Sequence, residues 1–137
     1  MKKNPLFFCV EENVLDGDTG KVTGWGRAEF QQVRPILRES SVGIISNQMC
    51  RKKWFSIVDN KELIKSTVVC AQGLNANVST CNGDSGNPLV VQRNGKWHLI
   101  GVSSFGSLRG CSIPGIPSVF TRISSFLDWI AVNMAKP

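Results

Sequence analysis

Two short runs of strand-forming residues joined by an asparagine-glycine pair constrain the fold more than any other feature. The runs are Leu89–Gln92 and Trp97–Val102, and Asn94-Gly95 lies between them. Both central residues of a two-residue hairpin loop must adopt positive φ, which Asn and Gly tolerate best. The sequence therefore predicts an antiparallel β-hairpin over residues 89–102.

The rest of the chain extends this prediction to an all-β protein. Thirteen glycines, six prolines and many short β-branched stretches indicate frequent turns, and 42% apolar with 19% charged residues is ordinary for one soluble domain. Lys21–Gly26 is typical of a strand that runs into a glycine turn. Val33–Ile45 has strand composition interrupted by Pro35.

Two helices are predicted. Ser46 can cap a short helix from about Asn47 to Lys53, after which residues 54–66 form a polar loop. Near the end of the chain, Ser125–Asp128 has the form of a capping box. Apolar residues then recur at helical spacing on one side, which predicts a C-terminal helix docked on the domain: Phe126, Trp129, Ile130 and Met134.

The charge and the apolar runs argue against two classes of partner. A net charge of +6 could favour nucleic acid, but no stacking aromatics lie between the cations, so a solvated face is the better interpretation. No apolar run approaches the roughly 18 residues that span a bilayer. Residues 1–11 begin with basic residues, but their apolar core is shorter than a signal peptide requires, so we expect mature-type sequence.

Five cysteines and one histidine are present, without a Cys-x-x-Cys pair, so a zinc site is poorly supported and no cofactor is expected. Disulfides formed in an oxidising compartment fit better. Because the number is odd, at least one thiol lacks a partner within this chain. The cysteines are Cys9, Cys50, Cys70, Cys81 and Cys111.

The segment Cys81–Pro88, with the sequence Cys-Asn-Gly-Asp-Ser-Gly-Asn-Pro, carries candidate chemistry. A catalytic serine needs an adjacent base and hydrogen-bond donors aimed at the developing oxyanion. Gly83 lets the backbone turn so that its N–H and that of Ser85 can converge. A polar turn without catalytic function is the alternative, because the segment is rich in turn formers.

Further motifs occur in order along the chain: Val22–Gly26, Gly101–Gly106, Cys111, Pro117–Arg122 and Trp129-Ile130. Together with the Ser85 segment they resemble the trypsin/chymotrypsin family of serine proteases over nearly the whole length, most closely chymotrypsin-like elastases. The resemblance implies the C-terminal antiparallel β-barrel of a two-barrel fold, followed by an α-helix. The N-terminal barrel would be absent, so residues 1–137 are expected to form the C-terminal portion of a peptidase domain.

The resemblance also implies the roles of residues around the serine. Ser85 would be the nucleophile, and the N–H groups of Gly83 and Ser85 would form the oxyanion hole. Asp84 would pair with the new α-amino group after zymogen cleavage. Ser104–Gly106 would bind substrate backbone by β-augmentation.

The same resemblance implies a specificity pocket. Ser79 would lie at its base, so no carboxylate is present there for Lys or Arg. Gly106 and Ser118 would form its walls, and both are small. Together with Phe105 they predict cleavage after large apolar residues. A glycosylation sequon at Asn77 lies so close to Ser79 that a glycan would conflict with substrate binding.

Cysteine pairing is implied in the same way. Cys50 would pair with Cys70, and Cys81 with Cys111. Another family disulfide would join the positions of Gly20 and Val91, and both of its cysteines are absent together. Cys9 resembles the cysteine that tethers the catalytic part to an upstream pro-segment or light chain; a buried inert thiol is the alternative.

The catalytic machinery in this chain is incomplete. His98 is the one histidine, and its place on the hairpin puts it roughly 20 Å along the strand from Ser104, so it cannot be the base. In the family the histidine and the aspartate of the triad come from upstream. We therefore expect the chain alone to be inactive and marginally folded. Asn87, where the family has glycine, could also crowd the nucleophile loop.

Three functions compete. The first is a secreted serine endopeptidase whose partners are polypeptide substrates, protein protease inhibitors and an upstream chain linked through Cys9, with no nucleic acid or membrane partner. The second is a non-catalytic homologue that acts as a binding or regulatory module. The third, an unrelated small β-domain, is hard to reconcile with the ordered motifs. Ser85, Gly83 and Asp84 favour the endopeptidase.

Overall fold

A computed structural model gives the fold, and its described part comprises residues 16–26, 36–60, 62–75, 80, 84–106, 113 and 115–137. The elements in chain order are β1 (Thr19–Gly24), β2 (Arg38–Ile45), α1 (Asn47–Phe55), β3 (Val68–Gly73), β4 (Pro88–Arg93), β5 (Lys96–Phe105), β6 (Ser118–Arg122), a 3-10 helix η1 (Ile123–Phe126) and α2 (Leu127–Met134).

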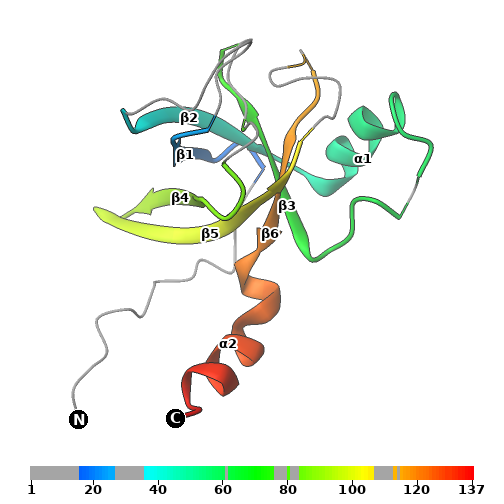
Figure 1. Cartoon of the computed structure of the whole chain (residues 1–137). Coiled ribbons are helices and arrows are strands. Elements are labelled where there is room, and N and C mark those ends of the chain that lie inside the picture. The colour runs from blue at the N-terminus through cyan, green and yellow to red at the C-terminus, as the bar shows by residue number, and fades with distance from the viewer. Residues whose placement is uncertain are drawn as a thin grey trace.

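The six strands form a closed antiparallel β-barrel in the order β1-β2-β3-β6-β5-β4. In Figure 1, α1 lies at one side of the barrel and α2 extends away from it. The predicted all-β barrel with a C-terminal helix is therefore confirmed. β1 and β4 close the barrel, and Gly20 lies opposite Val91 in their register, as expected for two positions that a family disulfide could join.

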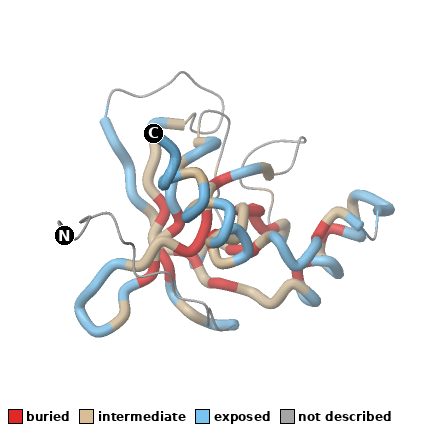
Figure 2. Tube along the Cα trace, turned by 90° about the horizontal axis from the view of Figure 1, so that it is seen from below, coloured by how far each residue is buried: buried red, intermediate tan, exposed pale blue. Residues whose placement is uncertain are grey.

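The core inside the barrel receives residues from every strand. Because side chains alternate across a strand, residues two apart, such as Leu89 and Val91, point inward together. Figure 2 shows the buried segments gathered in the strands at the centre, while α2 is mostly exposed. The core residues are Val22, Val42, Ile44, Val69, Ala71, Leu89, Val91, Ile100 and Phe120.

The predicted hairpin and the first helix cap are confirmed. β4 and β5 pair across Asn94 and Gly95, which have φ values of 51° and 75°. The Ser46 hydroxyl accepts a hydrogen bond from the Met49 N–H at 3.1 Å. Helix α1 continues to Phe55, beyond the predicted end, because Trp54 is buried in a second core between the helix and the barrel.

The predicted start and packing of the C-terminal helix are wrong. The chain enters α2 through η1, and Phe126 occupies the N-cap position without a side-chain hydrogen bond, so Ser125 caps nothing. No residue of α2 is buried, and Trp129 is 66% exposed. Periodicity identified the helix, but an apolar face does not reveal what covers it. Among the described residues, neither helix is long and apolar enough to cross a membrane.

Gly101 tests how tightly the barrel is packed. A Cβ atom at this position would lie 2.8 Å from the Phe120 Cβ on the neighbouring strand β6 and 3.1 Å from the Val69 Cγ1 on β3. We expect Gly101→Ala to lower the free energy of unfolding by about 1–3 kcal/mol through overpacking. Urea denaturation measures this change.

Gly43→Ala is the matched control, because a Cβ atom there would meet the exposed Leu74 side chain at 3.4 Å, a contact that can adjust. Equal unfolding midpoints for the two variants would contradict this account of the core.

Candidate active site

Ser85 lies at the second position of a tight turn. The Asn87 N–H donates to the Asp84 carbonyl at 3.0 Å, and Gly86 has a φ of 87° at the third position. This positive φ is typical of a type II turn and favours glycine. Ser85 itself is exposed, so the turn presents its hydroxyl at the surface.

Two backbone hydrogen bonds hold this turn against β5. The Gly86 N–H donates to the Ser103 carbonyl at 2.9 Å, and the Ser103 N–H donates to the Asn87 carbonyl at 2.8 Å. The two residues that follow Ser85 are therefore tied directly to Ser103, near the end of β5. Among the described non-glycine residues only Asn94 has positive φ, so the backbone of Asn87 is not left-handed.

The Asp84 side chain faces the end of β1. Its Oδ1 atom accepts a hydrogen bond from the Gly26 N–H at 2.9 Å and lies 3.5 Å from the Asn87 Nδ2. A Cβ atom at Gly24 or Gly26 would overlap the Asp84 carboxylate. The Gly-Trp-Gly sequence therefore allows the turn after β1 to approach the residue beside Ser85.

A β-bulge shapes the strand beside the turn. Ser103 pairs with Phe120 and Phe105 pairs with Val119, so Ser104 has no partner on β6. Ser104 is also exposed. Bulges commonly redirect a strand next to functional sites. Here the bulge separates the part of β5 that completes the barrel from the segment predicted to bind substrate backbone.

Gly106, the last residue of this segment, is brought together with Thr80 and Ser118. The buried Ser118 hydroxyl accepts a hydrogen bond from the Thr80 N–H at 3.2 Å. A Cβ atom at Gly106 would lie 3.7 Å from the Thr80 carbonyl oxygen. Gly106 and Ser118, both predicted as pocket walls, thus flank the backbone of Thr80, the residue that follows Ser79 in the chain.

Trp54 supports these segments, a role that was not predicted from the sequence. Its ring packs edge-on against Phe105, with ring centroids 5.5 Å apart. Its indole N–H donates to the Pro117 carbonyl at 3.1 Å. The same side chain therefore contacts both stretches that carry the predicted walls. Its position 63 residues before Pro117 explains why no local pattern revealed this role.

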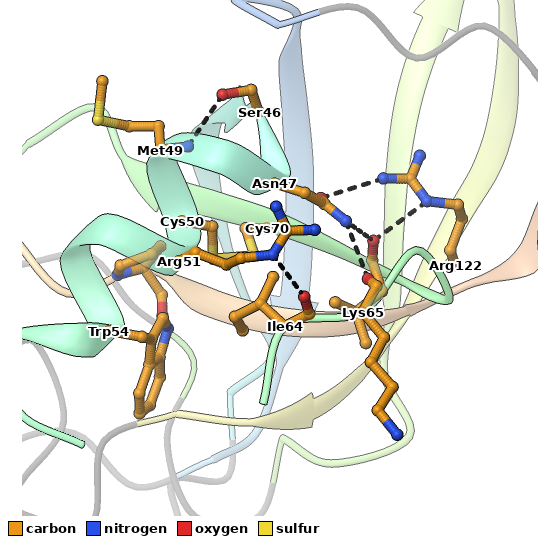
Figure 3. Close-up of a disulfide and its surroundings, with 12 residues drawn as sticks. Ser46, Asn47, Met49, Cys50, Arg51, Trp54, Ile64, Lys65, Cys70 and Arg122 are labelled. Carbon is orange, nitrogen blue, oxygen red and sulfur yellow. Dashed lines mark hydrogen bonds between the residues drawn. A yellow bond between two sulfur atoms is a disulfide. The ribbon is translucent and has the colours of Figure 1, made fainter. Parts of the chain in front are cut away.

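The predicted Cys50–Cys70 disulfide is confirmed and fixes α1 to β3. Closing a loop of this length constrains the unfolded chain and stabilises the fold by about 3 kcal/mol. Figure 3 shows the neighbouring bonds: the Arg51 Nε donates to the Ile64 carbonyl, and an Arg122 nitrogen donates to the Asn47 side chain. Burial lowers the pKa of Arg122. These bonds hold the helix that carries Trp54.

His98 is not brought to Ser85. It pairs with Val91 in the middle of the hairpin, whereas Val102, near the Ser85 turn, pairs with Pro88. Five residues separate His98 from Ser103, which corresponds to roughly 16 Å along an extended strand. No described residues form a group of three potential metal ligands.

Several predicted residues lie outside the described part of the chain: Cys9, Asn77, Ser79, Cys81, Gly83 and Cys111. Their roles, including the Cys81–Cys111 disulfide, stay predictions. The predicted site residues that are described gather on the Ser85 turn, the end of β5 and the start of β6: Asp84, Ser85, Ser104, Phe105, Gly106 and Ser118.

Gly24 tests the contact between β1 and Asp84. We expect Gly24→Ala to displace the Asp84 carboxylate, weaken its bond to the Gly26 N–H and destabilise the protein by about 1–3 kcal/mol through overpacking. Amide hydrogen exchange at Gly26 and Gly86, compared with the barrel core, measures the local effect. Gly43→Ala serves as the control, and unchanged exchange in Gly24→Ala would contradict the assignment.

Comparison with known families agrees with this arrangement. A family model described as Trypsin matches residues 6–130, which include all six strands of the barrel, the Ser85 turn and the residues around Thr80. The match thus spans both the scaffold and the candidate site. The chain belongs to the trypsin family.

Proposed function

We propose that this chain supplies the nucleophile and the substrate-binding strand of a serine endopeptidase. Membership of the trypsin family supports peptide-bond hydrolysis as the chemistry. The observation that carries the assignment is the hydrogen-bonded attachment of the Ser85 turn to Ser103, one residue before the exposed Ser104. A nucleophile held in this way lies next to a strand segment that can pair with an extended substrate.

In this proposal, the Ser85 hydroxyl attacks the carbonyl carbon of the scissile bond and forms an acyl-enzyme, which water then hydrolyses. The oxyanion accepts hydrogen bonds from the backbone N–H groups of Gly83 and Ser85. The type II turn at Asp84–Asn87 supports the role of Ser85, because its second residue projects away from the turn.

The base that removes the hydroxyl proton must come from outside this chain. His98 is the one histidine in the sequence, and its place on β5 is roughly 16 Å from Ser103. A serine–histidine unit provides most of the acceleration of such enzymes, so we propose that this chain is inactive alone. The histidine and the aspartate would be supplied by an upstream chain or segment, for which Cys9 is the proposed disulfide tether.

The proposed substrates carry large apolar side chains before the scissile bond. The residues grouped around the Thr80 backbone are small or uncharged, and Trp54 and Phe105 add an apolar surface behind them. Together with Ser79 in place of a carboxylate, they favour Phe, Leu, Met or Tyr over Lys or Arg. Extracellular polypeptides and protein protease inhibitors are the proposed partners.

Adding imidazole in place of the missing histidine tests whether Ser85 is the nucleophile. Imidazole can act as a general base in solution, so we expect it to promote acylation of Ser85 by the p-nitrophenyl ester of N-acetyl-phenylalanine. Intact-mass and peptide mass spectrometry should locate one acetyl-phenylalanyl group on Ser85. Without imidazole, the chain and Ser85→Ala should hydrolyse the ester at equal rates. The corresponding lysine ester should give less adduct.

Ser125→Ala is the matched control, because this serine is exposed on η1, away from the Ser85 turn, and its loss should leave the adduct intact. Adduct on serines other than Ser85, or its absence under all conditions, would contradict the endopeptidase. If phenylalanine-containing peptides still bound the chain, that result would support the non-catalytic binding module instead.

A further inference from the structure

We propose that Asn87 is a positioning residue for Ser85, acting through the carboxylate of Asp84. The Asn87 side-chain amide points to Asp84 Oδ1 at 3.5 Å and would lie 2.7 Å from a Cβ atom on Gly24. This inference rests on the proposed function of Ser85 as a nucleophile. Asn87 stands where the family has glycine, and in this proposal its side chain helps to hold the turn that carries Ser85.

Asn87 connects the two sides of the turn through three contacts. Its backbone N–H donates to the Asp84 carbonyl, and its own carbonyl accepts from the Ser103 N–H. These two bonds use the backbone and would survive any substitution other than proline. The third contact, from the side-chain amide to the Asp84 carboxylate, depends on asparagine itself.

The side-chain contact supports the orientation of Asp84. A half-buried carboxylate needs hydrogen-bond donors, and the Gly26 N–H provides one at 2.9 Å. The Asn87 amide approaches the same oxygen, Oδ1, at 3.5 Å. Asp84 therefore stays directed at the end of β1, and the residue next to it, Ser85, is held between β1 and β5.

The hydrogen bond from the Asn87 side-chain amide to Asp84 is long, at 3.5 Å. We therefore expect its contribution to stability to be at the weak end of the range for hydrogen bonds to charged groups. The side-chain contact lies beside the bond that joins Asp84 to the Gly26 N–H, so its loss acts on the turn and leaves the barrel pairing intact. We expect loss of the amide to raise the opening of the turn by about two- to fivefold without unfolding the barrel.

Native-state hydrogen exchange, followed by NMR on the 137-residue chain with its disulfides formed, tests the role. In Asn87→Ala, the Gly26 and Gly86 amides should exchange about two- to fivefold faster relative to those of Val91 and Ile100 in the barrel core. Gln92→Ala is the matched control, because Gln92 is exposed on the same strand region and should change neither ratio.

Asn87→Asp distinguishes a role in orienting the Asp84 carboxylate from a role in packing. The substitution keeps the shape of the side chain but replaces the amide donor by a second carboxylate beside Asp84. Like charges this close raise the pKa of one of the two carboxyl groups. The Gly26 amide proton should shift and exchange faster at neutral pH. It should return towards its original position as the pair takes up one proton, because the introduced group then has an O–H to donate.

A Gly26 amide with the same chemical shift and exchange ratio in Asn87→Ala, Asn87→Asp and the original chain would overturn the positioning role. A shift in Asn87→Asp without the return at lower pH would do the same, since packing alone would explain it. These signals require no catalysis. Failure of Ser85 acylation would therefore overturn the proposed function, whereas unchanged amides would overturn this inference alone.

Discussion

The antiparallel pairing of β1 with β4 is the contact on which the candidate site depends. It closes the barrel and places Val22 opposite Leu89. Since β1 then ends where β4 begins, Gly24 at the end of β1 and Gly26 just after it meet the turn that precedes β4. The bond between the Gly26 N–H and Asp84, 58 residues apart in the chain, is a direct result of this closure. The scaffold thus adds a long-range contact to the hydrogen bonds that the Ser85 turn makes within itself.

A second set of long-range contacts, made by helix α1, supports the site from outside the barrel. The Cys50–Cys70 disulfide and the bonds of Arg51 fix α1 to β3 and to the loop before it. Trp54 then supports the chain at Phe105 and Pro117. The residues proposed as pocket walls, Gly106 and Ser118, directly follow Phe105 and Pro117 in the chain. Trp54 therefore supports both walls through the residue that precedes each of them.

Two local patterns predicted local structure correctly, whereas a third, the capping box at Ser125–Asp128, did not. The Asn94-Gly95 turn and the Ser46 cap depend on residues within a few positions of each other, so their chemistry is visible in the sequence. The Cys50–Cys70 pair came from family resemblance, which carries long-range information. Patterns failed where distant contacts decide the outcome. Trp54 looked like the start of a loop, although burial against Pro117 extends the helix.

The exposure of the four tryptophans gives the protein a built-in optical probe. Trp25, Trp97 and Trp129 are 51%, 53% and 66% exposed, whereas Trp54 is 5% exposed. A water-soluble quencher such as acrylamide would reach the first three and leave emission from Trp54. The residual fluorescence would therefore come from a single indole packed behind the proposed pocket. Its wavelength would report changes in that pocket without an attached label.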